Sequence, residues 1–158
     1  MLDYTVLVLP GAYAASVATT VDMLHAAEVV APSLRLPSPT WQVVSPFGGS
    51  IELSGRMRID TRRMLRADGS TWIVPGLGAG SPAELTQRMS GDAARRAVSA
   101  LKRYAMSGRT IAASCSAVFL LQAAGLLAGR RATTSWWLAA ELRRIEPTCT
   151  VDADRMVC

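Results

Sequence analysis

The chain has 158 residues, half of them hydrophobic, and its 17 basic and 12 acidic side chains give a formal net charge of +5. This length is enough for one hydrophobic core, and no apolar run approaches the roughly eighteen residues that a membrane-spanning helix needs. Residues 1–10 carry an acid in place of the basic residues that open a secretory signal peptide. We therefore expect a cytoplasmic protein that makes no contact with a membrane.

Cysteine and arginine usage excludes further classes. The cysteines, Cys115, Cys149 and Cys158, are widely spaced and form no CxxC pair. The sequence therefore predicts neither a disulfide framework nor a metal site. Much of the positive charge lies in one cluster, which lacks the interleaved aromatic residues of a nucleic-acid surface, so we interpret it as a solvated face. Its members are Arg56, Arg58, Arg62, Arg63 and Arg66.

Strand and helix patterns alternate along the chain. Apolar or alternating runs predict strands at residues 4–9, 41–45, 50–54, 56–60, 71–75, 111–113, 148–151 and 155–158. Helical spacing of apolar residues predicts helices over residues 16–31, 92–107 and 117–124, and after Ser81 and Ser135. Residues 50–54 and 56–60 have the pattern of antiparallel strands, which indicates an excursion from the main sheet. The alternation is typical of an α/β fold with a mainly parallel sheet.

Ligands of such sheets bind outside the carboxyl ends of the strands. Three segments lie at these ends, namely the Pro10-Gly11 turn, the Gly76-Leu-Gly-Ala-Gly80 loop and the turn at Cys115. The glycine loop lacks the full G-x-G-x-x-G spacing of a dinucleotide site, so we expect no cofactor.

Cys115 is the best candidate for chemistry. It lies between the predicted strand at residues 111–113 and the predicted helix at residues 117–124, and Ala113 and Ala117 flank it two positions away. Small residues at these positions are what a nucleophile elbow requires, because strand and helix approach closely there. A helix N-terminus also favours negative charge and so activates a thiol. The alternative is a buried cysteine that acts as a small hydrophobe, and the local sequence leaves both open.

Four stretches, in this order, resemble one superfamily. They are Val6-Leu-Val-Leu-Pro-Gly with Asp22-Met-Leu after it, Ile73-Val-Pro-Gly, Ala113-Ser-Cys-Ser-Ala followed by Phe119-Leu-Leu, and Ala124-Gly-Leu-Leu-Ala-Gly-Arg-Arg-Ala-Thr-Thr-Ser-Trp-Trp. Together they resemble the ThiJ/PfpI family of class I glutamine amidotransferase-like domains. The last stretch is similar to the amino-terminal sensor domains of AraC-type transcription regulators. The resemblance covers nearly the whole chain and implies a flavodoxin-like three-layer sandwich over residues 1–158.

The resemblance also implies roles for single residues. It makes Cys115 the nucleophile of the elbow, and it makes the backbone N–H groups of Leu77 and Ser116 the oxyanion donors. Two positions depart from the family pattern, because Ser135 stands where the family has a histidine and Ser16 stands where it has an acid. A thiol without a base has lost its usual activating group, so we expect hydrolysis to be disabled.

Other residues have plainer interpretations. His25, the only histidine, falls inside the first predicted helix, away from the elbow by the resemblance, and a packing or surface role outweighs a catalytic one. Trp136 and Trp137 either line a pocket or fill the core, and core filling is the more common use. The family fold continues past the Val-Asp-x-Asp-Arg segment, matched here by residues 151–155. We therefore expect a C-terminally truncated fragment, with a naturally short protein as the alternative.

The leading hypothesis is a non-catalytic ligand-sensing and dimerisation domain of an AraC-family regulator. It would bind a small-molecule effector, form a homodimer, and reach DNA only through a helix-turn-helix domain that is not in this chain. The runner-up is a ThiJ/PfpI-type cysteine hydrolase or isonitrile hydratase, and a thiol stress sensor is a third possibility. The expected ligand-binding residues are Gly11, Ser16, Gly76, Leu77, Cys115, Ser116 and Ser135.

Overall fold

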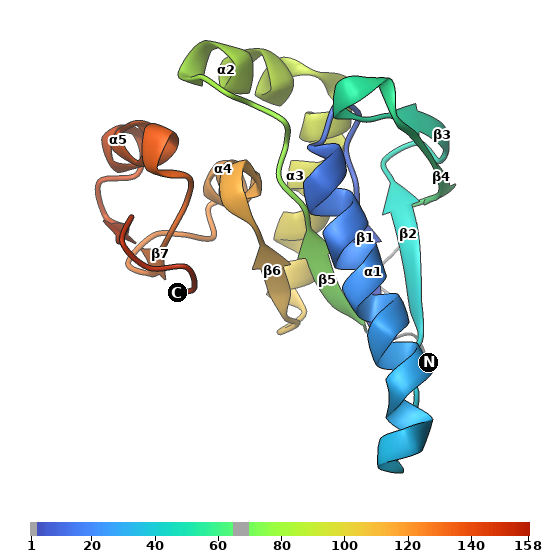
Figure 1. Cartoon of the computed structure of the whole chain (residues 1–158). Helices are drawn as coiled ribbons and strands as arrows, with labels where there is room; N and C mark the ends of the chain where they lie inside the picture. Colours follow the sequence, from blue (N-terminus) through green and yellow to red (C-terminus); the bar gives the residue numbers. More distant parts are fainter. Residues whose placement is uncertain (1–2, 65–69) are drawn as a thin grey trace.

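Six strands form one sheet in the computed structural model, which describes residues 3–64 and 70–158 (Figure 1). The order of the strands across the sheet is β3-β4-β2-β1-β5-β6. Every neighbouring pair is parallel except β3 with β4, so the mainly parallel sheet is confirmed. The strands are β1 Tyr4–Leu7, β2 Trp41–Ser45, β3 Gly49–Glu52, β4 Arg58–Arg63, β5 Thr71–Val74 and β6 Ile111–Ala113.

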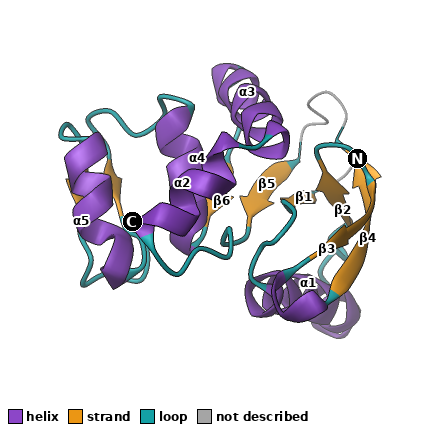
Figure 2. Cartoon of the chain, turned by 90° about the horizontal axis from the view of Figure 1, so that it is seen from above, coloured by secondary structure: helices purple, strands orange, loops and turns teal. Residues whose placement is uncertain are grey.

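Helices cover both faces of this sheet. Seen from above, α1 lies on one side and α3 on the other, which gives the three layers expected of the α/β fold (Figure 2). Within the described residues, no helix is both long and apolar enough to cross a bilayer. The helices are α1 Ala14–Val30, η1 Ala31–Leu34, η2 Ser54–Arg56, α2 Pro82–Ser90, α3 Asp92–Met106, η3 Cys115–Ala117, α4 Val118–Ala123 and α5 Trp136–Ile145, where η marks short 3₁₀ helices.

The central strand β1 shows why both faces must be covered. Successive side chains of a strand point to opposite faces, and both Val6 and Leu7 are fully buried. Val6 belongs to the cluster that includes Val17 of α1, whereas Leu7 belongs to the cluster that includes Leu101 of α3. A strand with buried apolar side chains on both faces is stable only between two helical layers.

The two strands predicted as an excursion instead extend the main sheet. The antiparallel pairing of β3 with β4 is confirmed, but β4 also pairs in parallel with β2, with Val44 opposite Arg62 and Ser45 opposite Arg63. The Ser45 Oγ lies 2.7 Å from the Thr61 Oγ1, which joins the same two strands through their side chains. The backbone edge of β2 would otherwise lack partners, and β4 supplies them.

Strand β6 lies at the other edge of the sheet, whereas the sequence predicted a buried strand. It pairs with β5, with Trp72 opposite Ile111 and Val74 opposite Ala113. The middle residue, Ala112, is exposed, and no second strand of the described residues pairs with β6. Its apolar composition therefore did not indicate burial.

A separate two-stranded sheet pairs β7, Arg131–Ala132, in parallel with β8, Thr150–Val151. The strand predicted at residues 155–158 is wrong. The Arg155 side chain pairs with the Asp152 carboxylate at 3.1 Å, and the Asp154 N–H donates to the same carboxylate. These short-range contacts turn the chain where a strand would need a neighbour for its backbone.

Two further predictions concern the exposure of the arginine cluster and the first residue of α1. Arg56, Arg58, Arg62 and Arg63 are all exposed, which agrees with a solvated face, and Arg66 lies outside the described residues. Helix α1 begins at Ala14, before the predicted residue 16. The Ser54 hydroxyl accepts a hydrogen bond from the Ala14 N–H at 2.9 Å, so a cap from a distant segment lengthens the helix.

Gly78 permits a close contact that a side chain would prevent. Its φ is +68°, and a Cβ at this position would collide with the carbonyl oxygen of Gly11. Gly129 has almost the same φ, +67°, but a Cβ there would meet open space.

This pair separates steric overlap from backbone strain. Both Gly78→Ala and Gly129→Ala should lower the free energy of unfolding by roughly 1–2 kcal/mol, which is what a left-handed backbone costs alanine. We expect Gly78→Ala to lower it by about 1–3 kcal/mol more, because the overlap forces the two loops apart. Urea unfolding measures both free energies, and equal losses in the two variants would contradict the contact.

Candidate functional site

Cys115 occupies a strained corner. Its φ of +54° lies in the left-handed region, which a non-glycine residue rarely adopts. The Ser114 N–H donates to the Val74 carbonyl at 3.0 Å and continues the strand pairing up to this corner. The fully buried Ala117 then begins the packing of the helix. A strained strand-to-helix turn that exposes the side chain of its corner residue is the geometry of a nucleophile elbow.

The helix after the corner differs from the predicted one. It opens with the 3₁₀ turn η3 and continues as α4, which ends at Ala123. A short helix with an irregular first turn has a weaker dipole than the continuous helix expected over residues 117–124. Activation of the Cys115 thiol therefore depends more on its direct neighbours, and less on the helix dipole, than the sequence indicated.

Ser135 is the direct neighbour of the thiol. Its Oγ lies 2.7 Å from the Cys115 Sγ, and either atom can be the donor. Ser135 precedes α5, yet its side chain makes no capping hydrogen bond to that helix. The adjacent Thr134 hydroxyl donates to the Cys115 carbonyl at 3.0 Å, so residues 134–135 are docked on the elbow. The position where the family has a histidine thus contacts the thiol through a hydroxyl group.

Ser16 lies beside the elbow without a hydrogen bond to the thiol in the described part of the chain. Its Oγ accepts a hydrogen bond from the Gly76 N–H at 3.1 Å and lies 3.3 Å from the Ser114 Oγ. These contacts tie α1 to the ends of β5 and β6. Ser16 therefore holds the residues next to Cys115 in place.

The amide of Leu77 is already engaged. Its N–H donates to the Ser116 Oγ at 2.9 Å, and both residues are buried. A backbone N–H has one hydrogen to donate. Leu77 can therefore reach an oxyanion beside Cys115 only by giving up this bond. The contact fixes the glycine loop against the first turn after the elbow.

Gly76 brings the elbow close to a residue that the sequence analysis missed, Tyr13. A Cβ on Gly76 would lie 3.3 Å from the Cys115 Cβ and 3.4 Å from the Tyr13 Cδ2, so only a hydrogen atom fits comfortably between them. The Tyr13 N–H donates to the Gly76 carbonyl at 3.0 Å. Burial raises the pKa of Tyr13, and the nearby Cys115 and Glu84 raise it further. An aromatic residue just after the Pro10-Gly11 turn is the signal that could have identified it.

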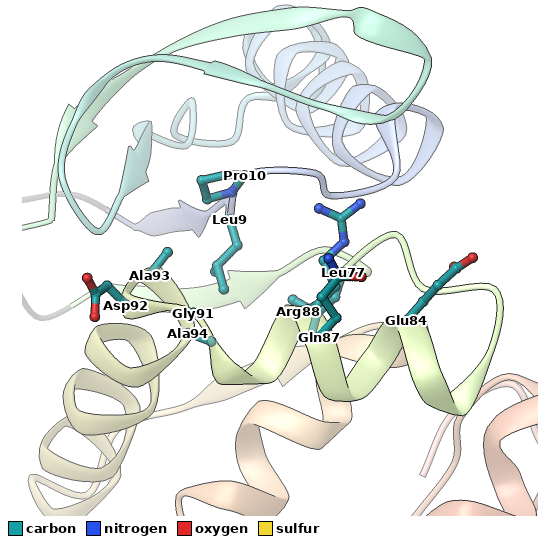
Figure 3. Close-up of a pocket in the computed structure, with 10 residues that line it drawn as sticks. All are labelled: Leu9, Pro10, Leu77, Glu84, Gln87, Arg88, Gly91, Asp92, Ala93 and Ala94. Atoms are coloured by element: carbon teal, nitrogen blue, oxygen red, sulfur yellow. The ribbon is translucent and has the colours of Figure 1, made fainter.

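Gly11 lies beside Arg88 of α2 and not beside the Cys115 thiol. The Arg88 guanidinium packs directly on it, so a side chain on Gly11 would collide with Arg88. Figure 3 shows Arg88 reaching from α2 toward the Pro10 turn across a cavity of about 370 Å³, whose other lining residues include Leu9 and Leu77. Cys115 does not line this cavity but a second one, of about 610 Å³. Pro10 and Leu77 of the expected pocket thus line the first cavity and Cys115 lines the second, whereas Gly11 and Ser135 line neither of the two.

The remaining candidate side chains lie away from the elbow. The His25 side chain is two-thirds exposed and lies 3.8 Å from the Glu28 carboxylate. It follows Ser16 by nine residues on α1, which is about 13 Å along a helix axis. Trp136 and Trp137 are exposed, and their rings pack edge to face with centroids 5.5 Å apart. The prediction that they fill the core is therefore wrong. No cluster of potential metal ligands occurs among the described residues.

The fold and the cysteine corner define an α/β protein of the nucleophile-elbow type. A family model for the DJ-1/PfpI family matches residues 41–157. The chain belongs to the DJ-1/PfpI family, as its sequence motifs predicted. No curated protein sequence gives a significant match.

Solved structures share this fold. An AraC family transcriptional regulator from Pseudomonas putida matches with a TM-score of 0.70 and 18% identity, over 97% of this chain and 77% of that one. A protein described as a transcriptional regulator from Vibrio parahaemolyticus matches with a TM-score of 0.73 and 18% identity, over 98% and 78%. DJ-1beta from Drosophila melanogaster gives 0.70 and 16%, over 98% and 76%. Regulators and other members of the family thus share one architecture.

Two thiols provide an internal comparison of reactivity. Cys149 is buried, and burial, with Glu146 and Cys158 nearby, raises its pKa, whereas Cys115 is partly exposed. Alkylation requires an accessible thiolate, so iodoacetamide at about pH 8 should modify Cys115 about tenfold faster than Cys149 in the folded protein. Peptide mass spectrometry over time measures both rates, with urea-unfolded protein as the control in which they converge. Faster modification of Cys149 in the folded protein would contradict the exposed elbow.

Proposed function

We propose that residues 1–158 form the ligand-sensing and dimerisation domain of an AraC-family transcription regulator, and that this domain does not turn over a substrate. The contact between Cys115 and Ser135 carries the proposal. A serine hydroxyl cannot accept the thiol proton at neutral pH, as a histidine would. General-base assistance typically contributes about 10²–10⁴-fold to a rate, and this corner lacks it among the described residues.

Ser135 and Ser16, which stand where the family has a histidine and an acid, leave a site suited to binding. The hydroxyl groups of Ser135 and Ser16 remain at the elbow, close to the Gly76 loop. Hydroxyl groups both donate and accept hydrogen bonds. A small polar or anionic effector is therefore the ligand class that this corner favours, with Tyr13 as an aromatic wall beside it.

Dimerisation is supported by the far end of α1. This end projects beyond the sheet (Figure 1) and continues into η1. Its exposed apolar residues form one stretch of the chain, and apolar surface of this kind favours association with another protein surface. The residues are Met23, Val29, Val30, Leu34 and Leu36.

The structural neighbours and the cysteines support a regulator domain in the cytoplasm. The structural similarity to an AraC family regulator supports a sensor role, in which a separate helix-turn-helix domain would bind DNA. All three cysteines are free thiols, which suits the reducing cytoplasm. We place the domain there.

A cysteine hydrolase or isonitrile hydratase is the second candidate. One observation favours it, namely the strained φ of Cys115, because strain at a corner residue is often retained for chemistry. In that case the Ser116 N–H at the elbow would stabilise the oxyanion.

Ligand-induced stabilisation tests the sensor proposal. A ligand at one hundred times its Kd stabilises a fold by roughly 2.7 kcal/mol, so a thermal-shift screen of small polar and anionic metabolites should give hits. We expect Ser135→Trp to abolish them, because its indole fills the space beside Cys115. Ser90→Trp, at an exposed position on α2, should retain them.

Two results would overturn this proposal. Hits that Ser135→Trp leaves unchanged would place the ligand elsewhere. Turnover of amides, isonitriles or α-oxoaldehydes that disappears in Cys115→Ser, and persists in Cys149→Ser, would establish the enzyme instead.

Charge introduced on the projecting end of α1 tests dimerisation. The double variant Val29→Glu, Leu34→Glu should be monomeric where the parent chain is dimeric, because burying two unpaired carboxylates in an interface is strongly unfavourable. Thr86→Glu, Gln87→Glu adds the same charge to an exposed part of α2 and should stay dimeric. Light scattering after size-exclusion chromatography measures the masses. A dimer that survives the first pair of substitutions would place the interface elsewhere.

A further inference from the structure

The cavity of about 370 Å³ lies between the Pro10 turn and the corner where α2 meets α3 (Figure 3). We call it the α2–α3 cavity. Its volume falls at the lower end of the range for small-molecule sites. Cys115 and Ser135 are absent from its described lining, so it is distinct from the effector site proposed at the elbow.

The floor of the α2–α3 cavity is apolar. Leu9 follows β1, Leu77 follows β5, and Ala94 lies in the first turn of α3, and all three residues are buried. Aliphatic surface that faces a cavity gains free energy when an apolar group replaces water there. This part of the cavity therefore favours a compact aliphatic body.

Arg88 places a cation beside this floor. Its guanidinium packs on Gly11, where a Cβ would collide with it, so the absence of a side chain on Gly11 leaves room for the guanidinium. Within residues 3–64 and 70–158, no ion pair joins Arg88 to an acid. A guanidinium presents a fork of N–H donors that matches a carboxylate with two parallel hydrogen bonds. Arg88 is therefore available to an anionic ligand.

Two acidic residues of the lining limit the charge of that anion. The Glu84 carboxylate accepts a hydrogen bond from the Gly80 N–H at 2.7 Å, and the Asp92 carboxylate pairs with Arg95. Figure 3 shows these two carboxylates at opposite ends of the lining, with Arg88 between them. A dianion such as a phosphate group would be repelled from both ends, whereas a monocarboxylate carries only the charge that Arg88 neutralises.

We propose that the α2–α3 cavity binds a small aliphatic monocarboxylate, with its carboxylate on the Arg88 guanidinium and its hydrocarbon chain against Leu9 and Leu77. A chain of about four to six carbons suits a cavity of this size. This second site goes beyond the function proposed for the elbow and does not require it.

A titration of the whole chain with matched probes tests the proposal. The probe is 4-methylpentanoate. Its amide, 4-methylpentanamide, keeps the shape without the charge, acetate keeps the charge without the aliphatic body, and inorganic phosphate carries the second charge. The backbone amide signals of Ala93 and Ala94 in nitrogen-15 spectra should shift saturably with 4-methylpentanoate at about millimolar concentration. The other three probes should bind at least about tenfold more weakly.

Matched variants identify the role of Arg88. Arg88→Gln should weaken binding of 4-methylpentanoate at least about tenfold, because an uncharged amide replaces the guanidinium. Arg103→Gln removes the same charge from an exposed position of α3, eleven residues after Asp92 and about 16 Å along the helix axis, and should bind as the parent chain does. If Arg88 only fills the space over Gly11, its replacement by Gln would leave the affinity unchanged.

A second pair of variants keeps Arg88 and fills the cavity. Gln87 is exposed and lines the cavity, so Gln87→Trp should abolish binding of 4-methylpentanoate by occupying its space without disturbing the core. Ser90→Trp, at an exposed position of the same helix outside the described lining, should retain it. Urea unfolding of each variant checks that the fold is intact.

Contrary results are distinct from failure of the elbow proposal. No saturable shift at about ten millimolar probe, equal affinity for the amide, tighter binding of phosphate, or equal affinity of Arg88→Gln and Arg103→Gln would each overturn the monocarboxylate site. Ser135→Trp should leave the titration unchanged. Loss of binding in Ser135→Trp, with retention in Gln87→Trp, would instead place the carboxylate at the elbow.

Discussion

The close approach at Gly76 is the constraint on which the rest of the site depends. The Cys115 Cβ and the Tyr13 ring lie on either side of a residue without a side chain. This approach places the Gly76 N–H against the Ser16 hydroxyl and the Leu77 N–H against the Ser116 hydroxyl. Strands β5 and β6, helix α1 and the elbow are thereby joined at one point. The left-handed backbone of Cys115 persists because these contacts fix both sides of the corner.

Hydroxyl groups hold this corner together through hydrogen bonds. Ser16, Ser114, Ser116, Thr134 and Ser135 all make hydrogen bonds there. Each group both donates and accepts, so a neutral network can be satisfied without a charged partner. A base would need to gain and lose a proton in the same place. The corner therefore keeps the geometry of an elbow while the proton acceptor of an elbow enzyme is missing from its described neighbours.

The sequence predicted the architecture better than the pocket. The central strands could be read from local patterns, because strands buried on both faces need continuous apolar residues, and small residues around Cys115 predicted the corner. Pairing of β4 with β2 depends on which edge is free, which no local pattern records. The packing of Arg88 on Gly11 is a contact between residues 77 positions apart in the chain, which no local pattern records either. Such long-range packing decides the shape of a site even where each loop is placed correctly.

Tyr13 reaches from the elbow toward the start of α2. Its ring lies over Gly76 beside Cys115, and its hydroxyl lies on the side of Gly80, toward the start of α2. Burial, Cys115 and Glu84 raise the pKa of Tyr13, while Arg88 opposes them, so its pKa depends on groups on both sides. A negative ligand near the elbow would add to the forces that keep the phenol neutral. The neutral hydroxyl can donate a hydrogen bond to such a ligand, which makes Tyr13 the aromatic counterpart of the serine hydroxyls around the thiol.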